Sequence, residues 1–482
     1  MTLIKSLLLG SAATLVVVAG AQAADLPTKK GAPAAEYVKV CKIDGMAGFV
    51  IPGSDTCLKI TGYLTGQVTA GNLDTGYAFA GGSKTAGPAY GAPSTYSNET
   101  ALAAIPASAR ADVGFTTRAE VELIAKTNTA YGVLTSDIDM QYNYGSGFDN
   151  TGAGNGFINH GFLNWAGITA GKANSFFSAF GGGEGWANLF SPDQQGYNQP
   201  LLLAYTATFG GGFSATISLQ DPIVGGPSGL GVDEAIAANS GYQGLRSPDI
   251  VAAIDLVQGW GSAHIAGVAH NVNMNDSVWY GTSYQGTGNS LNTWGWAIDG
   301  GLKFNLPTIG AGDEISLQGA WSRNATWYSG LPGAMWDEAW GFGAGGGVNG
   351  NGVGMPVADA YSNHNGTWAT PEAWTIAASG EFHLGPTFMI DPEVGYGQLN
   401  WSGLTYGVLS TSTTSWMGGA VFHWDPVAHL DFNLELLYQS SNMSRPAAWS
   451  GDIIVNNTTT TGNAWKSTSQ GLEGRLEITR DF

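Results

Sequence analysis

The sequence predicts an all-β fold: a transmembrane antiparallel β-barrel of about 16 strands, with short periplasmic turns, long external loops and a third loop folded inward. The first observation is the last stretch of the chain, where apolar and charged residues alternate, the apolar ones being Leu472, Leu476, Ile478 and Phe482. An extended strand places alternate residues on opposite faces, so this strand has one apolar and one charged face. The second observation is that similar segments recur in pairs, joined alternately by short and long connections.

Composition is the third observation, because it favours a membrane barrel over a soluble domain. Only 11% of the 482 residues are charged, against about 25% in typical soluble proteins. The mean hydropathy is -0.01, and no apolar run of about 18 residues follows the N-terminus, which excludes helical membrane spans. Strands that alternate between lipid and water average to neutral hydropathy and escape that test. The net charge of -19 leaves no basic patch for phosphates, so nucleic acid is not an expected partner.

The N-terminus has the organisation of a cleaved signal peptide covering residues 1–23. Lys5 supplies a positive charge, Leu7 to Val18 form an apolar segment, and Ala21-Gln22-Ala23 provide a small-residue cleavage site. The mature chain is therefore predicted to be exported and to begin at Ala24. An uncleaved helical anchor is the alternative, disfavoured because the apolar segment is short.

Residues 24–57 are predicted to form an N-terminal periplasmic segment. It contains the two cysteines of the chain, Cys41 and Cys57. In an oxidising compartment an isolated pair most simply forms one disulfide, which would contribute about 3 kcal/mol by closing a short loop. Metal binding by this pair is not expected, because four-ligand zinc spacing is absent.

The barrel itself is predicted to cover residues 58–482. From Asp112 the chain alternates between an apolar set that includes Phe115 and Val121 and a polar set that includes Arg118, Glu120 and Glu122. After a short turn the pattern repeats, which predicts a hairpin with an acidic inner face. Five further hairpins are predicted from pairs of segments: 201–209 with 213–219, 250–256 with 263–269, 294–304 with 315–321, 376–384 with 388–398, and 416–424 with 430–438.

Long connections separate these hairpins and are rich in Gly, Ser, Thr and Asn, at residues 70–111, 221–246, 324–370 and 440–465. Short turns on one side and long polar loops on the other are typical of outer-membrane barrels. An even strand number returns the C-terminus to the periplasmic side. Pairing of the first strand with the last would remove both sheet edges, whose unpaired backbone groups are costly in lipid.

The third external loop, residues 178–199, differs from the other connections. It carries large apolar residues among glycines, which are Phe180, Trp186, Leu189, Phe190 and Tyr197. A fully solvated loop has little use for such residues, so we expect it to fold back onto the inner wall. An ordinary surface loop with incidental aromatics is the alternative.

A pore constriction is predicted where this loop meets the wall. Its carboxylates Glu184 and Asp193 are expected to face basic groups of the wall, of which Arg118 and Arg475 are best placed by strand parity, with Glu120 and Glu122 beside them. The resulting transverse field would orient dipolar solutes and disfavour apolar ones.

Several stretches, in this order along the chain, resemble the general porins of Alphaproteobacteria: A-A-D-L-P, E-Y-V-K-V-C, P-G-S-D-T-C-L-K-I-T-G-Y, G-I-T-A-G-K-A-N-S-F-F, L-L-A-Y-T-A-T-F-G-G-G-F-S-A-T, S-P-D-I-V-A, W-G-S-A-H-I-A-G-V-A-H and G-W-A-I-D-G-G-L-K-F-N-L-P. They cover nearly the whole mature chain. The resemblance implies a 16-stranded outer-membrane barrel, usually a homotrimer, with the third loop as constriction. It also implies that the terminal Phe482 is read by the barrel assembly machinery. The chain departs from the family in its long Gly-rich loops and its charge-poor constriction region.

The expected function is therefore a passive, water-filled channel for small hydrophilic solutes and ions, set in outer-membrane lipid and lipopolysaccharide. The acidic composition suggests a mild cation preference. Two alternatives remain open: a substrate-specific porin with an aromatic track for sugars, and a non-conducting barrel whose loops act as adhesin or receptor.

No enzyme, cofactor or metal site is expected from the motifs. The chain has no G-x-S-x-G elbow, and the glycine run 343–354 lacks the Lys-Ser/Thr of a phosphate loop. The seven histidines show neither an i, i+4 pair nor H-E-x-x-H. Tryptophans at strand ends are interpreted as an interfacial girdle: Trp165, Trp260, Trp294, Trp401, Trp416 and Trp424.

Overall fold

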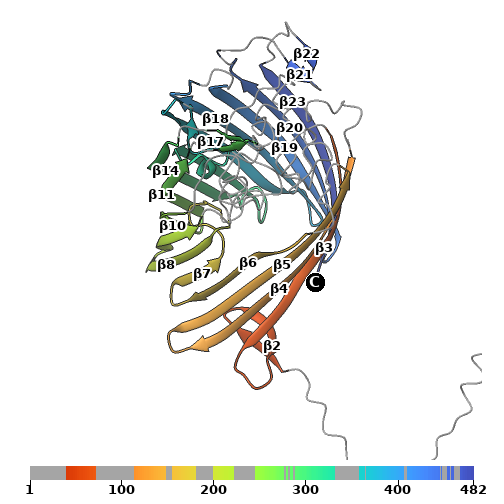
Figure 1. The fold of residues 1–482 in the computed structure, drawn as a ribbon. Coiled ribbons are helices and arrows are strands. Elements are labelled where there is room, and N and C mark those ends of the chain that lie inside the picture. The colour runs from red at the N-terminus through yellow and green to blue at the C-terminus, as the bar shows by residue number, and fades with distance from the viewer. Residues whose placement is uncertain are drawn as a thin grey trace, which may run out of the picture.

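The computed structural model describes residues 39–71, 113–147, 155–180, 199–221, 245–275, 278–280, 283–285, 288–331, 358–363, 365–405, 410–445, 447, 453–455, 458–460 and 467–482. These residues form a barrel of tilted strands around a central space (Figure 1). The predicted signal peptide and the loop carboxylates Glu184 and Asp193 lie outside the described residues.

Sixteen strands close the barrel, and each pairs with its two neighbours in antiparallel fashion. They are β3 (Cys57–Gly71), β4 (Val113–Thr129), β5 (Gly132–Gly147), β6 (Asn155–Trp165), β7 (Ile168–Lys172), β8 (Leu201–Gly210), β9 (Phe213–Asp221), β10 (Asp249–Gln258), β11 (Gly261–Asn275), β14 (Ser290–Asn305), β15 (Glu314–Arg323), β17 (Trp368–His383), β18 (Phe388–Ser402), β19 (Ser412–Val427), β20 (Leu430–Met443) and β23 (Thr468–Asp481). The predicted fold class and all the predicted hairpins are confirmed.

The last strand closes the barrel against the first. β23 pairs with β3 from Glu473 opposite Gly71 to Asp481 opposite Tyr63. The seam continues into the C-terminus, where the Phe482 amide donates to the Gly62 carbonyl oxygen at 3.0 Å. Closure leaves these two strands without an open edge, as the hydrocarbon core of a membrane requires.

Side chains alternate between the outside and the inside of the barrel with the period of two that a strand imposes. On β4 the apolar Phe115 and Val121 are exposed on the outer face, whereas Thr116 is buried on the inner face. On β23 Leu472 and Leu476 are exposed and Glu473 and Arg475 are buried. The sequence parity of both strands therefore predicts the two faces correctly.

Short turns join the strands at the end of the barrel where the C-terminus lies, and the strand ends joined by the long connections are at the other end (Figure 1). A hairpin of β1 (Val40–Ile43) and β2 (Met46–Val50) continues from β3 at the short-turn end. The disulfide predicted between Cys41 and Cys57 is present and ties β1 to the first residue of β3.

The long connections contain small elements of their own. Two hairpins form there, β12 (Val278–Tyr280) with β13 (Ser283–Gln285) and β21 (Ile453–Val455) with β22 (Thr458–Thr460). The connection after β15 holds a 3-10 helix, η5 (Thr326–Ser329), and the short strand β16 (Tyr361–Ser362). Across the described residues no helix has the length and apolar character needed to span a membrane.

Aromatic side chains lie on the outer surface at the short-turn end of the barrel. Tyr131 packs on Trp165 with 5.8 Å between ring centroids, and Trp260 packs on Phe304 at 5.6 Å. Trp and Tyr prefer the membrane interface, where one end of the ring is apolar and the other wet. Five of the six predicted girdle tryptophans are exposed, but Trp401 is buried. It follows Leu399 by two residues on the inner face of β18, where it packs against Tyr361, so its assignment to the girdle was wrong.

Candidate functional site: the lining of the barrel

Polar side chains line the inner faces of β20, β23, β3, β4, β5 and β6, which we call the polar wall. On β3 these are Thr65, Gln67 and Thr69, and on β5 Asp139, Gln141 and Asn143. Most of them bond laterally to a neighbouring strand or along their own. The Gln141 amide, for example, donates to Glu120 Oε2 at 2.6 Å. Such bonds hold the polar groups flat against the wall.

Arg118 lies on the inner face of β4, as strand parity predicts. Its Nε donates to Asn143 Oδ1 at 2.8 Å, and its backbone amide donates to Thr65 Oγ1 at 3.2 Å. Glu120 and Glu122 follow on the same face, and both are half-buried. The three predicted wall residues of β4 thus share the polar wall.

Arg475 forms a buried ion pair that the sequence did not reveal. It lies directly opposite Glu435 of β20 in the strand register, and its Nη2 contacts Glu435 Oε2. The two side chains are only 2% and 1% exposed. Arg475 was expected to face the carboxylates of the third loop. Its guanidinium meets Glu435 of the neighbouring strand within the wall, and the loop carboxylates lie outside the described residues.

Acidic groups predominate among the ionisable side chains of this half of the barrel. Inward-facing basic groups on its described strands include Arg118 and Arg475, and Lys172 lies on β7 beside it. The inward-facing carboxylates of β4, β5, β20 and β23 are Glu120, Glu122, Asp137, Asp139, Asp431, Glu435, Glu473 and Glu477, and β18, outside the polar wall, adds Asp391 and Glu393. Of these, Glu120, Glu122, Asp137, Asp431 and Glu477 are partly exposed, so they contact the lumen.

The connection between β7 and β8, the third on the long-loop side, starts along the inner wall. Ser175 Oγ donates to Gln220 Oε1 of β9 at 2.8 Å, and the Phe177 carbonyl oxygen lies 3.2 Å from His264 Nε2 of β11. Farther on, the Lys303 ammonium of β14 sits 5.5 Å from the centre of the Phe180 ring. Gly301 provides the space, because a Cβ there would lie 2.5 Å from the Ala179 Cβ. Residues 173–180 therefore turn into the barrel.

The connection between β15 and β17, the sixth on the long-loop side, also enters the barrel with its described residues 324–331 and 358–363, against the expectation of an external polar loop over 324–370. Trp327, Tyr328 and Leu331 are fully buried against inner faces of the wall. The Ser329 carbonyl oxygen accepts from Thr375 Oγ1 of β17 at 2.6 Å, and a Cβ on Gly397 of β18 would clash with Leu331. These contacts cover an apolar part of the wall whose members include Val251, Val268, Val272, Met274, Ala373 and Leu399.

A buried hydrogen-bond network fixes this inserted segment. His270 of β11 lies between two carboxylates, 2.9 Å from Asp249 of β10 and 3.3 Å from Asp359 of the sixth connection. The Tyr328 hydroxyl donates to Asp249 Oδ2 at 2.5 Å, and Asp359 Oδ1 accepts from the Thr326 amide at 2.6 Å. Because each carboxylate has donors, the segment is held by polar as well as apolar contacts.

Residues 25–469 match the porin subfamily. The chain belongs to this family. Porin Omp2b of Brucella canis is 30% identical over 360 residues, which cover 67% of this chain and 86% of the relative. Porin Omp2a of Brucella ovis is 32% identical over 325 residues, covering 62% of this chain and 86% of the relative. Among solved structures, the outer membrane channel DcaP of Acinetobacter baumannii gives a TM-score of 0.54 at 13% identity, covers 91% of this chain and all of that chain, and supports the fold alone.

This porin is thus an outer-membrane channel protein, as the resemblance to alphaproteobacterial general porins implied. Its structure places four of the six predicted constriction residues on the polar wall, namely Arg118, Glu120, Glu122 and Arg475. Glu184 and Asp193 are outside the described residues. Sequence reasoning missed the sixth connection as a lining element. Its signal was the apolar pair Trp327-Tyr328, followed by Leu331, at the start of a connection that carries further large apolar residues such as Trp336, Trp340 and Phe342.

Proposed function

We propose that this porin is a general diffusion channel for small hydrophilic solutes and ions, with a preference for cations. The observation that carries the proposal is the excess of carboxylates among the partly exposed side chains of the polar wall. Carboxylates in a water-filled lumen between low-dielectric walls raise the local concentration of cations and lower that of anions. Arg475, the basic group most deeply set in this wall, is already neutralised by Glu435.

We further propose that the third and sixth connections together narrow the lumen. Both cover the apolar part of the wall between β9 and β18, so the aqueous path follows the polar wall. Glu184 and Asp193 of the third connection would then face the lumen across from Arg118, Glu120 and Glu122. This arrangement supports a transverse orientation of the field, since the polar and covered walls lie on different sides of the barrel.

We also propose how the chain is processed, where its parts lie and how it assembles. Residues 1–23 are removed as a signal peptide, residues 24–57 lie in the periplasm, and the outer surface contacts lipid and lipopolysaccharide. The porin assembles as a homotrimer with help from the barrel assembly machinery. It acts without catalysis. The exposed apolar outer face and the aromatic ring at the short-turn end support the membrane orientation.

The reversal potential across a planar bilayer under a salt gradient tests the cation preference. The expected value has the sign of cation selectivity, and it should move toward zero in the double variant Glu120→Gln/Glu122→Gln. Glu372→Gln is the matched control, because this exposed carboxylate lies on the outer face of β17. An anion-selective wild type would contradict the proposal.

Two further measurements separate the alternatives. Liposome swelling that depends only on solute size supports the general channel, whereas saturation by one sugar would indicate a substrate-specific porin. Purified trimers that give no single-channel steps would indicate an adhesin or receptor instead.

A further inference from the structure

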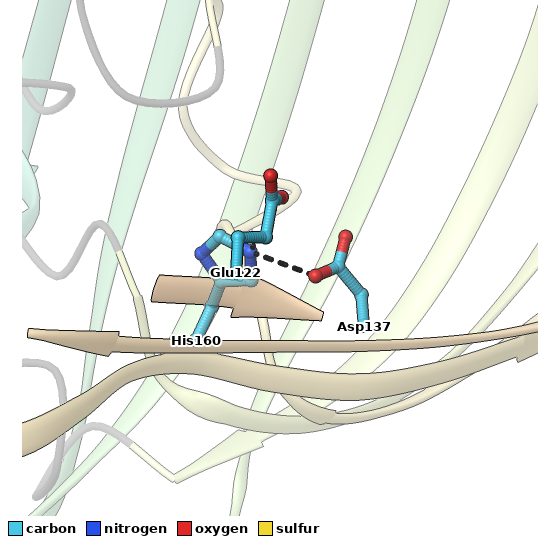
Figure 2. Close-up of side chains that lie close together, drawn as sticks. All are labelled: Glu122, Asp137 and His160. Carbon is cyan, nitrogen blue, oxygen red and sulfur yellow. Dashed lines mark ion pairs between the residues drawn. The ribbon is translucent and has the colours of Figure 1, made fainter. Parts of the chain in front are cut away.

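Three neighbouring strands bring one histidine and three carboxylates together on the polar wall. Glu122 comes from β4, Asp137 and Asp139 from β5, and His160 from β6. The register places Glu122 opposite Asp139, and Asp139 opposite His160. Figure 2 shows the His160 ring beside Glu122, with one ring nitrogen directed toward Asp137.

A β-bulge in β6 produces this arrangement. Asp139 pairs with His160 and Met140 pairs with Ile158, so Asn159 is an extra residue without a partner in the register. Bulges re-aim side chains and recur beside functional sites. Here the side-chain amide of Asn159 donates to Asp139 Oδ2 at 2.6 Å, so the side chains of both Asn159 and His160 lie on the face of β5 that carries Asp137 and Asp139. A regular strand would turn one of them toward lipid.

Two carboxylates lie near Nε2 of the His160 imidazole, and a third lies near Nδ1. His160 Nε2 lies 3.4 Å from Asp137 Oδ1 and 3.8 Å from Glu122 Oε1. On the other side, His160 Nδ1 lies 3.4 Å from Asp139 Oδ2. Glu122, Asp137 and His160 each offer one ligand atom, and these three atoms lie within 4.8 Å of one another.

The cluster has three carboxylates and few donors, since only the Asn159 side-chain amide and the His160 imidazole are placed to serve them. Asp139 is only 3% exposed, and its Oδ1 is buried with no hydrogen-bond partner. Asp137 Oδ1 is also buried, and it has His160 Nε2 at 3.4 Å but no bond of hydrogen-bond geometry. The nearby Lys172 ammonium is directed to the Asn159 carbonyl oxygen and to Gln199 Oε1. Buried carboxylates without a counter-charge are costly. A cation placed between Asp137, Glu122 and His160 Nε2 would remove that cost.

We propose that Glu122, Asp137 and His160 bind a divalent transition-metal ion of the zinc type in the channel wall. Imidazole nitrogen with carboxylate oxygens suits zinc, whereas calcium prefers oxygen ligands alone. Zinc lies about 2.0–2.2 Å from such ligands, so ligand atoms that lie within 4.8 Å of one another need only small side-chain shifts. Lumen water completes the coordination. Asp139 is a positioning residue, which holds the Nδ1 proton of His160 so that Nε2 faces the metal.

Bound metal would alter the channel by changing its charge. The Glu122–Asp137–Asp139 group contains three carboxylates, and a divalent ion adds two positive charges beside them. Because the group lines the proposed cation path, zinc would reduce cation conductance through the channel. Zinc binding itself does not depend on the proposed channel function and is measurable without any current.

Zinc binding is tested by equilibrium dialysis and calorimetry on the full-length porin in detergent, after chelator treatment, with zinc and with calcium. The wild type should bind one zinc per chain and prefer zinc to calcium. His160→Gln and Asp137→Asn should each raise the zinc Kd at least tenfold. Asp139→Asn should raise it less, because Asp139 only orients the imidazole.

The matched control is His423→Gln. His423 also lies on the inner wall, but it meets one carboxylate at each nitrogen, Asp391 at 2.8 Å and Asp431 at 3.9 Å. This variant should bind zinc like the wild type. Heat-modifiable mobility on gels verifies that each variant is folded. If Asp137→Asn is folded and His160→Gln is not, Asp137→Asn alone decides.

Three results would overturn the proposal. They are no zinc uptake by the folded wild type, equal loss of zinc affinity in His423→Gln, and unchanged affinity in the folded variants of the cluster. The first result would mean that a protonated His160 supplies enough positive charge to stabilise the buried carboxylates without a metal ion. In a parallel bilayer recording, zinc should lower the single-channel conductance of the wild type more than that of His160→Gln.

Discussion

Phe177 and Tyr328 pack edge to face inside the barrel, with 4.9 Å between ring centroids and 73° between ring planes. Phe177 belongs to the third connection and Tyr328 to the sixth, and both are only 1% exposed. Aromatic pairs of this geometry contribute about 0.5–1.5 kcal/mol beyond their burial. The two inserted segments therefore stabilise each other, and a substitution in one should destabilise the inserted conformation of the other.

Truncation of Tyr328 should widen the channel. Tyr328→Ala removes the ring that contacts Phe177 and the hydroxyl that donates to Asp249, at a cost of about 3–5 kcal/mol to local packing. We expect a higher and noisier single-channel conductance from the folded variant. Tyr328→Phe is the matched control, because it keeps the ring and loses only the hydroxyl, and its conductance should change less. Equal conductance in Tyr328→Ala and wild type would show that the sixth connection does not narrow the path.

Removal of Arg475 should destabilise the barrel. Glu435 would then be left buried without its counter-charge, which costs about 3–5 kcal/mol when a buried ion pair is broken on one side. Arg475→Ala should therefore unfold at a lower temperature on heated gels, and Arg475→Ala/Glu435→Gln should recover part of the loss. Arg480→Ala is the control, since Arg480 is exposed and bonds to backbone carbonyl oxygens at the rim. A double variant no more stable than Arg475→Ala would contradict this account.

Strand faces were predictable from the sequence because the side-chain period of a strand is fixed at two. Arg118 and Glu120 on β4 and Arg475 on β23 therefore lie on the inner face, as their odd or even positions indicate. The closure of the barrel followed from a physical requirement, the pairing of every backbone group in lipid. Neither prediction needs the register between neighbouring strands.

The contacts between strands were not predictable in the same way. The pair of Arg475 with Glu435 depends on the register of β20 against β23 across a long connection. His160 reaches Asp137 only because a bulge shifts the register of β6 by one residue. The insertion of Trp327 depends on space inside the barrel, which local periodicity does not describe. The sequence therefore predicts which residues line the barrel, but not which of them contact one another across neighbouring strands.

Reduction of the disulfide should loosen the N-terminal hairpin and leave the pore unchanged. Cys41 and Cys57 are 16 residues apart, and a crosslink that closes such a loop contributes about 3 kcal/mol. In Cys41→Ser/Cys57→Ser we expect faster proteolysis within residues 39–56, while single-channel conductance stays at the wild-type value. The hairpin lies beyond the short-turn end of the barrel, which is the reason for this separation. A large change in conductance would indicate that the hairpin contacts the aqueous path.

Deletion of Phe482 should impair assembly through two separable effects. The Phe482 backbone exchanges two hydrogen bonds with Gly62, at 3.0 and 3.2 Å, and its carbonyl oxygen accepts from Thr61 Oγ1 at 2.8 Å. Its ring is 61% exposed on the outer face, where it is free to be read during assembly. Phe482→Ala keeps the backbone bonds and removes the ring, so it isolates the second effect.

If the exposed ring is the assembly signal, Phe482→Ala should lower the yield of folded porin in the outer membrane as strongly as the deletion does. Both variants should still refold in detergent from urea, because the barrel retains every other pair of the β3–β23 seam. The measurement is the ratio of folded to unfolded protein on unheated gels, from membranes and from refolding mixtures. If Phe482→Ala assembles at the wild-type level while the deletion fails, the seam bonds of the last residue, rather than its ring, are what assembly requires.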